Sequence, residues 1–225
     1  MTSRTPAESV LDNCETLMLD MDGTLLDLAF DNYVWKTLIP ERYAGKHGLP
    51  VDEARRELFG RYGRVQGDLK WYCLDHWSEA LGVDILELHR EVNHRIGYLP
   101  RAEEFLKTMH AHHVRVIMVT NSHPDTLALK DQVTGLTRYF DAVYTSHDFG
   151  FAKERQEFWQ ALRDAEGFRA ETSVMVDDTH AVLRSARQYG IDGLVAIARP
   201  DTTEPRRQDS DFVDVEGVSE LLADR

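Results

Sequence analysis

Cysteine is scarce in this sequence, which has only Cys14 and Cys73 in 225 residues. Their separation fits neither a metal site nor a redox pair, so we expect both to be reduced, structural thiols. Long hydrophobic runs are also lacking, and no segment reaches the ~18 consecutive apolar residues of a membrane span. The polar residues 1–6 contain no apolar signal core. These absences predict a cytoplasmic protein with no membrane partner.

Basic residues are outnumbered, with 26 Lys and Arg against 39 Asp and Glu, for a formal net charge of −13. This balance argues against nucleic-acid polymers and anionic membranes as partners. It does not exclude a small phosphorylated substrate, because a bound cation and one well-placed lysine can reverse the local field. The hydrophobic content of 42% suffices for a real core, and the length permits one large domain or a core with a smaller insert.

The chain is organised around residues 17–27, Leu-Met-Leu-Asp-Met-Asp-Gly-Thr-Leu-Leu-Asp. The apolar run is typical of a buried strand, and its carboxyl end is where ligands bind in open α/β sheets. Asp20 and Asp22 would project to the same side, roughly 7 Å apart, which suits a hard cation. Gly23 would let the backbone turn sharply. The alternative is a plain turn in which an aspartate caps a helix.

After residue 99 the pattern alternates between helices and strands. We expect strands over 16–19, 114–119, 142–144, 173–176 and 194–198. Helices are expected over 101–112, 125–133, 154–165, 180–189 and 218–222, with a polar arm over 1–13 and a polar loop over 199–211. Such alternation predicts a mostly parallel sheet with helices on both faces, an α/β fold of the Rossmann-like three-layer kind.

Residues 28–99 lack strand signals and are too long for an ordinary connection. We expect a small helical domain there, with helices over 53–59, 69–81 and 85–92, inserted into a core made of residues 1–27 and 100–225. Its aromatic side chains can stack on the ring of a ligand or form the domain's own core. Core packing is favoured for Trp77, while for Tyr33 the two readings are equally open. Lys70 and Arg64 are further candidate substrate contacts.

Polar residues follow two more of the expected strands, Thr120 and Asn121 on one and Asp177 and Asp178 on the other. Parallel strands bring these ends to one edge, which Lys153 could also reach. Adjacent carboxylates beside a buried strand are costly without a counter-ion, which favours a Mg²⁺ site over a simple helix cap. Thr120 and Asn121 can hydrogen-bond phosphate oxygens or merely form a turn.

Three histidines, His110, His112 and His113, lie close together at the end of an expected helix. They are far along the chain from the acidic strand ends. We expect them to be solvated or helix-terminal side chains instead of metal ligands.

Four motifs in this order and spacing, Asp20-Met21-Asp22-Gly23-Thr24, Thr120-Asn121, Lys153 and Asp177-Asp178, resemble those of the haloacid dehalogenase superfamily. The insert resembles that superfamily's helical C1 cap. More narrowly, residues 25–33 and 71–75 resemble the bacterial GMP/IMP 5′-nucleotidase group. Two departures are Thr120, where Ser is commoner, and Glu154, where many members carry Pro.

The resemblance implies a role for each residue. Asp20 would be the nucleophile that forms an aspartyl-phosphate, and Asp22 would be the general acid and then the base. Mg²⁺ would be held directly by Asp20, Asp178 and the backbone carbonyl of Asp22, and through water by Asp177. The phosphoryl oxygens would be held by Thr120, Asn121 and Lys153, and the substrate would also contact Tyr33.

The expected function is therefore that of a Mg²⁺-dependent phosphomonoesterase, foremost a 5′-nucleotidase acting on purine nucleoside monophosphates such as GMP and IMP. A phosphatase or mutase of phosphosugars or other small phosphometabolites is the alternative that the catalytic residues cannot separate. A haloacid dehalogenase needs neither an acid at Asp22 nor the Asp177-Asp178 pair, and a non-catalytic binding protein would not need the whole set. The sequence leaves the oligomeric state open.

Overall fold

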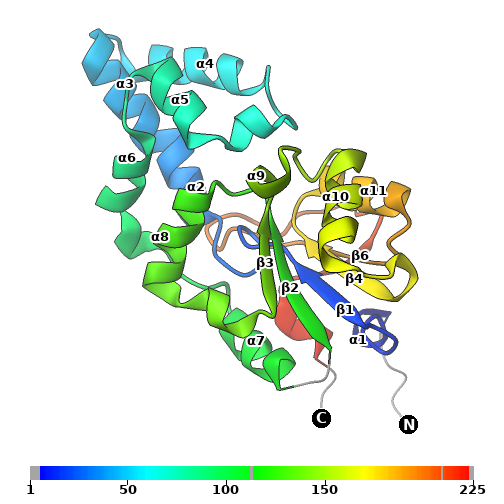
Figure 1. Ribbon diagram of the computed structural model, residues 1–225. Coiled ribbons are helices and arrows are strands. Elements are labelled where there is room, and N and C mark those ends of the chain that lie inside the picture. The colour runs from blue at the N-terminus through cyan, green and yellow to red at the C-terminus, as the bar shows by residue number, and fades with distance from the viewer. Residues whose placement is uncertain (1–5, 112–113, 209, 223–225) are drawn as a thin grey trace.

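A single parallel sheet forms the centre of the computed structural model, which describes residues 6–111, 114–208 and 210–222. The strand order is β3-β2-β1-β4-β5-β6 (Figure 1). The strands are β1 (Thr16–Leu19), β2 (Arg115–Thr120), β3 (Ala142–Thr145), β4 (Ser173–Asp177), β5 (Gly193–Ile197) and β6 (Val213–Val215). At the end of β1, Leu19 pairs with Met118 of β2 and with Val176 of β4. The carboxyl ends of three adjacent strands therefore lie at one level.

Both faces of the sheet are covered by helices, because side chains of a strand alternate between its two faces. Leu17 and Leu19 pack with Phe105 on one face, whereas Met18 packs with Trp159 on the other. The first face carries α1 (Pro6–Ser9), α7 (Ala102–His110) and the 3₁₀ helix η6 (Val218–Leu221), and the second carries α10 (Gln156–Glu166) and α11 (His180–Tyr189). The prediction of a three-layer α/β fold is confirmed.

The remaining core elements follow β2, β3 and α10 in the chain. They are α8 (Pro124–Thr134), η4 (Leu136–Tyr139), α9 (Ser146–Phe149) and η5 (Ala170–Thr172). Helix α8 begins immediately beyond the polar end of β2, and α9 begins at the end of β3. Both therefore start at the edge of the sheet where the polar residues gather.

Three local predictions were wrong. The sheet has a sixth strand, β6, which pairs with β5, so the strand over 194–198 is not the last. The expected polar arm contains α1. Both elements have four residues or fewer, too few for a periodic apolar pattern to stand out. The helix expected over 69–81 is split at Cys73, whose backbone is extended with φ −88° and ψ 111°.

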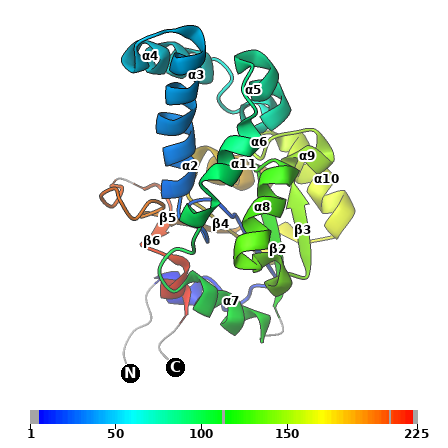
Figure 2. The ribbon, with the colours of Figure 1, turned by 90° about the vertical axis from the view of Figure 1, so that its left-hand side faces the viewer.

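Residues 29–95, here called the helical insert, form helices joined by turns and loops and include no strand. The π-helical turn η1 (Val34–Leu38) joins α2 (Ala29–Tyr33) to α3 (Ile39–His47), and these are followed by α4 (Val51–Tyr62), η2 (Leu69–Tyr72), α5 (Leu74–Leu81), α6 (Ile85–Glu91) and η3 (Asn93–Arg95). The chain leaves and re-enters the core side by side, since Asp27 N donates to Gly97 O at 2.9 Å and Leu99 N to Leu25 O at 2.8 Å. The insert stands beyond the carboxyl ends of the strands (Figure 2).

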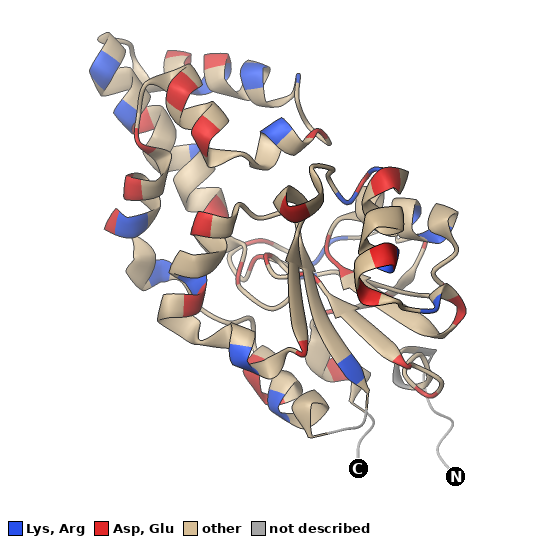
Figure 3. Ribbon diagram, in the orientation of Figure 1, with Lys and Arg blue, Asp and Glu red and all other residues tan. Residues whose placement is uncertain are grey.

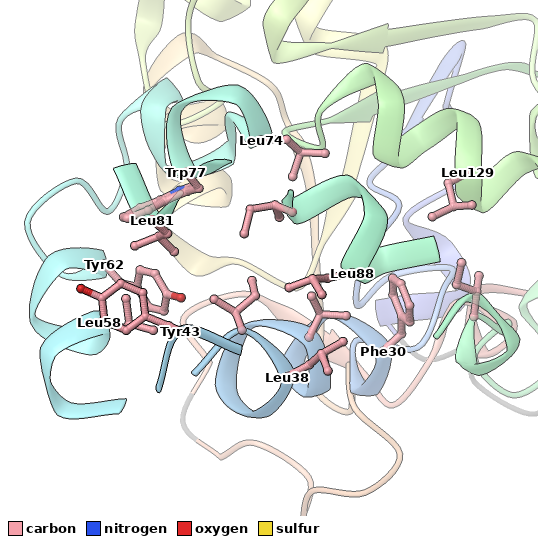
Figure 4. Packing of buried hydrophobic residues seen from close by; sticks show 14 of the residues in the cluster. Phe30, Leu38, Tyr43, Leu58, Tyr62, Leu74, Trp77, Leu81, Leu88 and Leu129 are labelled. Atoms are coloured by element: carbon pink, nitrogen blue, oxygen red, sulfur yellow. The ribbon is translucent and has the colours of Figure 1, made fainter. Parts of the chain in front are cut away.

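Aromatic side chains form much of the insert's own core (Figure 4). Trp77 is 2% exposed, and its Nε1 donates to the carbonyl of Trp71 at 2.9 Å. Tyr62 and Trp35 meet it edge-on, with ring centroids 4.9 and 6.2 Å away. The prediction that Trp77 is a core residue is confirmed.

Acidic and basic residues are interspersed along the ribbon of the sheet core and the helical insert (Figure 3). In the described part of the chain, no helix has both the length and the apolar character needed to cross a membrane. Cys14 and Cys73 are free thiols, as predicted. Of the three histidines near the end of α7, His112 and His113 lie outside the described residues.

His89 of α6 provides a pH test of the insert's packing. The ring is 1% exposed, meets Phe30 edge-on, and its Nδ1 lies 2.7 Å from Ile85 O. Burial lowers the pKa of His89 to about 4.

We predict that His89 makes the protein less stable as the pH falls. Between the ordinary pKa of 6.5 and about 4, His89 is protonated in the unfolded chain and neutral in the folded chain. The contribution of His89 to the free energy of unfolding therefore falls by about 3 kcal/mol as the pH is lowered through this range. Urea unfolding across this range should show the free energy of unfolding of the natural protein falling by this amount relative to that of His89→Gln. Equal pH slopes for the two proteins would contradict the prediction.

Candidate active site

Three adjacent strands end in the polar residues that the sequence singled out. Asp20 directly follows β1, Asn121 follows β2 and Asp177 ends β4. Asp20 N donates to Val176 O at 3.0 Å, so the ladder of β1 extends to the carboxylate-bearing residue. The three residues are 5%, 7% and 1% exposed, respectively. The parallel topology therefore brings together residues that are more than 150 positions apart in the chain.

Lys153 is the buried cation of this edge. Its Nζ donates to Asp20 Oδ1 at 2.5 Å, to Asp177 Oδ2 at 2.7 Å and to Val119 O at 3.0 Å. Burial opposes its charge, but the two carboxylates outweigh this and raise the pKa of Lys153 above its ordinary value. Its loop is fixed because Lys153 N donates to Asn121 Oδ1 at 2.9 Å. The prediction that Lys153 reaches the acidic edge is met by these contacts.

Asp20, Asp177 and Asp178 each place a carboxylate oxygen within 4.8 Å of the others. Burial above all, together with neighbouring carboxylates, raises the pKa of Asp20 to about 7 and those of Asp177 and Asp178 to about 6. Arg207 NH1 lies 3.1 Å from Asp178 Oδ2 and donates to its carbonyl at 2.7 Å.

The donor chemistry of this acidic cluster fits a hard divalent cation. Three carboxylates against the two cations Lys153 and Arg207 leave one net negative charge when all five groups are ionised. A divalent ion would reverse that sign and favour a phosphate dianion beside it. The residues that could hold Mg²⁺ are thus close together, buried and of the right type.

The turn after β1 depends on Gly23. Leu25 N and Leu26 N both donate to Met21 O at 2.9 Å, which folds the chain back on itself. Gly23 has φ +83°, and a Cβ there would lie 2.9 Å from Asp178 Cγ and 2.9 Å from Pro200 Cβ. Any side chain at this position would therefore strain the backbone and push into the acidic cluster.

Asp22 is held by a residue that the sequence did not point to. Lys130 Nζ, on α8, donates to Asp22 Oδ1 at 2.6 Å and to Asp31 Oδ1 at 2.7 Å. The Lys130 side chain is 1% exposed, and although burial opposes its charge, Asp22 and Asp31 raise the pKa of Lys130. Burial, followed by repulsion from Asp31, raises the pKa of Asp22 to about 6 against the lowering effect of Lys130. This lysine thus bridges the first motif and the helical insert.

The second motif also contacts the insert. Glu154 accepts from Asn121 Nδ2 at 3.1 Å and from the hydroxyl of Tyr72 at 2.7 Å. Thr120 Oγ1 accepts from Ser122 N at 3.0 Å, which leaves its own O–H available to donate. The departure from proline at position 154 therefore supplies a link between the insert and the candidate phosphate-binding residues.

The predicted substrate contacts on the insert are less closely tied to this edge. Tyr33 is half-buried, and the Arg95 guanidinium carbon lies 4.1 Å from the centroid of its ring. Arg64 and Lys70 are exposed. No described contact joins these residues to the acidic cluster.

Sequence reasoning gave Lys130 and Arg207 no part in the site, and it gave Asp31 and Tyr72 none beyond their place in the stretches 25–33 and 71–75 that resemble the nucleotidase group. A lysine within α8 and an arginine in a polar loop have the pattern of solvated surface residues. Asp31 and Tyr72 lie in the insert, whose position over the sheet edge cannot be derived from periodicity. One signal was present: Asp31 lies nine positions after Asp22, in the segment that leads from the first motif into the insert.

This chain is similar to known proteins both in sequence and in structure. The chain is 41% identical over 194 residues to GMP/IMP nucleotidase YrfG of Escherichia coli, covering 86% of this chain and 87% of that protein. It resembles the crystal structure of a HAD phosphatase from Thermococcus onnurineus with a TM-score of 0.76 at 21% identity, covering 92% and 95% of the two chains. It also resembles L-2-haloacid dehalogenase from Xanthobacter autotrophicus, with a TM-score of 0.64 at 16% identity and coverage of 92% and 96%.

The two solved structures share the fold with this chain, although one is a phosphatase and the other a dehalogenase. The fold alone therefore does not select a substrate. The sequence model of the haloacid dehalogenase-like hydrolases matches residues 14–190, which include all four motifs. The chain belongs to the haloacid dehalogenase-like hydrolase family.

Proposed function

We propose that this hydrolase is a Mg²⁺-dependent 5′-nucleotidase that removes phosphate from purine nucleoside monophosphates such as GMP and IMP. The observation that carries the proposal is the convergence of Asp20, Asp177, Asp178 and Lys153 at one buried edge. The 41% identity to a GMP/IMP nucleotidase over most of both chains supports the substrate class. The free thiols of Cys14 and Cys73 suit a reducing, cytoplasmic setting.

Asp20 is the proposed nucleophile. Its carboxylate attacks the phosphorus, the bond to the leaving oxygen breaks, and an aspartyl-phosphate forms. Lys153, 2.5 Å from Asp20 Oδ1, offsets the repulsion between an anionic nucleophile and an anionic phosphate. The Thr120 hydroxyl, at the end of β2, and the Asn121 amide, directly after it, donate to the phosphoryl oxygens.

Asp22 is the proposed general acid and base. It protonates the leaving 5′ oxygen and then takes a proton from the water that hydrolyses the aspartyl-phosphate. Both forms of its carboxyl group are therefore needed in one cycle. Burial favours the protonated form and Lys130 favours the ionised form, which leaves the pKa of Asp22 at about 6. A pKa in this range keeps both forms accessible near neutral pH.

Asp20 and Asp178, with the backbone carbonyl of Asp22, would hold Mg²⁺ directly, and Asp177 would act through water. When bound there, the ion supplies positive charge against the developing charge on the phosphoryl oxygens. Arg207 keeps Asp178 in place by contacting both its carboxylate and its carbonyl.

We propose that residues 28–99 act as a cap over the core formed by residues 1–27 and 100–225. The two crossing segments are paired through Asp27, Gly97, Leu25 and Leu99, which suits a narrow hinge. Closure would exclude water and bring side chains such as Tyr33 toward the nucleoside. Since the aromatic rings around Trp77 are used in the insert's own core, recognition falls to partly exposed residues nearer the hinge.

We predict a preference for purine nucleotides over other phosphomonoesters. The ratio kcat/KM for GMP and IMP should exceed that for simple sugar phosphates by at least about tenfold, because the insert would contribute binding only when a base is present. Phosphate release measured with excess Mg²⁺ tests this, and a chelator should abolish it. Equal values for GMP and sugar phosphates would exclude the nucleotidase assignment and leave the phosphatase assignment intact.

We predict that Asp20→Asn lowers kcat by at least about a thousandfold, because an amide cannot act as the nucleophile. The matched control is Asp192→Asn, which changes an exposed aspartate outside the site and should retain full activity. Stopped-flow phosphate release and acid-quench detection of phosphorylated protein measure the effect. Turnover within tenfold of the natural protein in Asp20→Asn would contradict the mechanism.

We predict that Lys130→Met lowers kcat by about 10- to 100-fold with a smaller change in KM, because Asp22 loses the contact that fixes its carboxylate. Lys107→Met, which removes an exposed lysine paired with Glu103 on α7, is the control and should behave like the natural protein. Circular dichroism verifies that both variants are folded. An unchanged kcat in folded Lys130→Met would contradict this role.

A further inference from the structure

Cys73, His123 and His147 meet at the junction between the helical insert and the sheet core. One ligand atom from each lies within 4.8 Å of those of the other two. Cys73 comes from the insert, where it joins η2 to α5. His123 is the N-cap residue of α8 and His147 lies in α9, so both come from the core. The hydrolysis described above uses none of the three.

The His147 side chain lacks a partner where one is needed. Its Nε2 atom is buried without a hydrogen bond, and its Nδ1 lies 3.5 Å from the Ser146 hydroxyl. A buried ring nitrogen without a partner costs free energy, which a ligand on that atom would remove. Burial, and then the adjacent His123, lowers the pKa of His147, so the ring is in the neutral form that binds metals.

Two carboxylates complete the surroundings of His123. Asp75 Oδ2, from α5 of the insert, lies 4.0 Å from His123 Nε2. Asp125 Oδ2 lies 3.7 Å from Nδ1 on the other side of the ring, and Asp125 N donates to that Nδ1 at 3.3 Å. A carboxylate behind the ring is the usual means of orienting a metal-binding histidine. An ion on Nε2 would require the ring proton on Nδ1, where the Asp125 carboxylate could accept it in place of the present bond from Asp125 N. The Asp75 side chain is 90% exposed, so it can turn toward that ion.

We propose that Cys73, His123 and His147 bind a Zn²⁺ ion, with the Asp75 carboxylate as the fourth ligand. One thiolate, two neutral imidazoles and one carboxylate suit tetrahedral zinc and balance its charge. Zinc bonds of ~2.0–2.3 Å require these side chains to move inward by roughly 1 Å. The sulfur donor separates this site from the acidic cluster, whose oxygen ligands suit Mg²⁺.

Zinc at this position joins the insert to the core beside the second motif. The Ser146 hydroxyl donates to Asn121 O at 3.2 Å, and Tyr72, the neighbour of Cys73, donates to Glu154 at 2.7 Å. The bound ion therefore holds closed the junction that borders the phosphate-binding residues. Its effect on turnover rests on the proposed function, in which the insert opens to release the nucleoside.

The test is a Co²⁺ titration of the full-length protein in excess Mg²⁺, because a cobalt–thiolate bond gives a charge-transfer band that oxygen ligands do not give. We expect the band, at one ion per chain, in the natural protein and in Cys14→Ser, which changes the other free thiol. Zn²⁺ should displace Co²⁺. Cys73→Ser should abolish the band, and His147→Gln should weaken Co²⁺ binding at least tenfold.

Absence of the band in the natural protein, or its persistence in Cys73→Ser, would overturn the site. Circular dichroism verifies the fold of each variant, and His147→Gln decides the question if Cys73→Ser does not fold. In excess Mg²⁺, Zn²⁺ should lower kcat on GMP in the natural protein and not in Cys73→Ser. Since the band needs no turnover, a chain that binds Co²⁺ through Cys73 but leaves GMP intact contradicts only the proposed function.

Discussion

Lys153, buried between Asp20 and Asp177, is the interaction on which the acidic edge of this protein depends. Three carboxylates that are almost excluded from water would repel one another and ionise poorly without a cation among them. The position of Lys153 is set by a hydrogen bond from its backbone N to the side-chain Oδ1 of Asn121. The second motif therefore fixes the cation that stabilises the carboxylates of the first and last motifs. The four motifs therefore form one electrostatic unit, and the parallel sheet, with β1 between β2 and β4, is the topology that brings them within reach.

The sequence predicted the aspartates, Thr120 and Asn121 of this unit because they stand at the ends of apolar strands, and it predicted Lys153 from its place after the third strand. The α/β fold was predicted from the alternation of apolar strands with helices after residue 99. Lys130 could not be found in this way, since a lysine in a helix is ordinarily solvated and its burial depends on carboxylates from two other segments. The cluster of Cys73, His123 and His147 was not predicted for a similar reason, because its members come from three separate segments of the chain. By contrast, His110, His112 and His113 were considered because they lie close together in the sequence. Short elements such as β6 were missed because three residues carry no period.

The helical insert has two demands on its aromatic residues, a core of its own and a surface for a ligand. A unit of this size has little apolar material, and the structure uses Trp77, Trp71 and Tyr62 for packing. Tyr33 lies instead near the hinge, with one cation, Arg95, beside its ring. Trp77 and Tyr62 are buried within the insert, whereas Tyr33, near the hinge, stays partly exposed. The same apolar cluster continues into the core through Met21, Met118 and Leu129, so the packing of the insert is joined to that of the sheet and α8.

Movement of the insert would alter the chemistry as well as access to it, because Lys130 is shared between Asp22 of the core and Asp31 of the insert. Repulsion from Asp31 raises the pKa of Asp22, and Lys130 lowers it. With the insert in contact, Asp31 repels the Asp22 carboxylate and also pairs with Lys130, which weakens the attraction of Lys130 for Asp22. The protonated form of Asp22 is then favoured. With the insert withdrawn, Lys130 faces Asp22 alone and favours the ionised form. The sign of this coupling suits the proposed hydrolysis, in which the first step, under a closed insert, would need an acid at Asp22, and the later step, which must admit water, would need a base at the same residue.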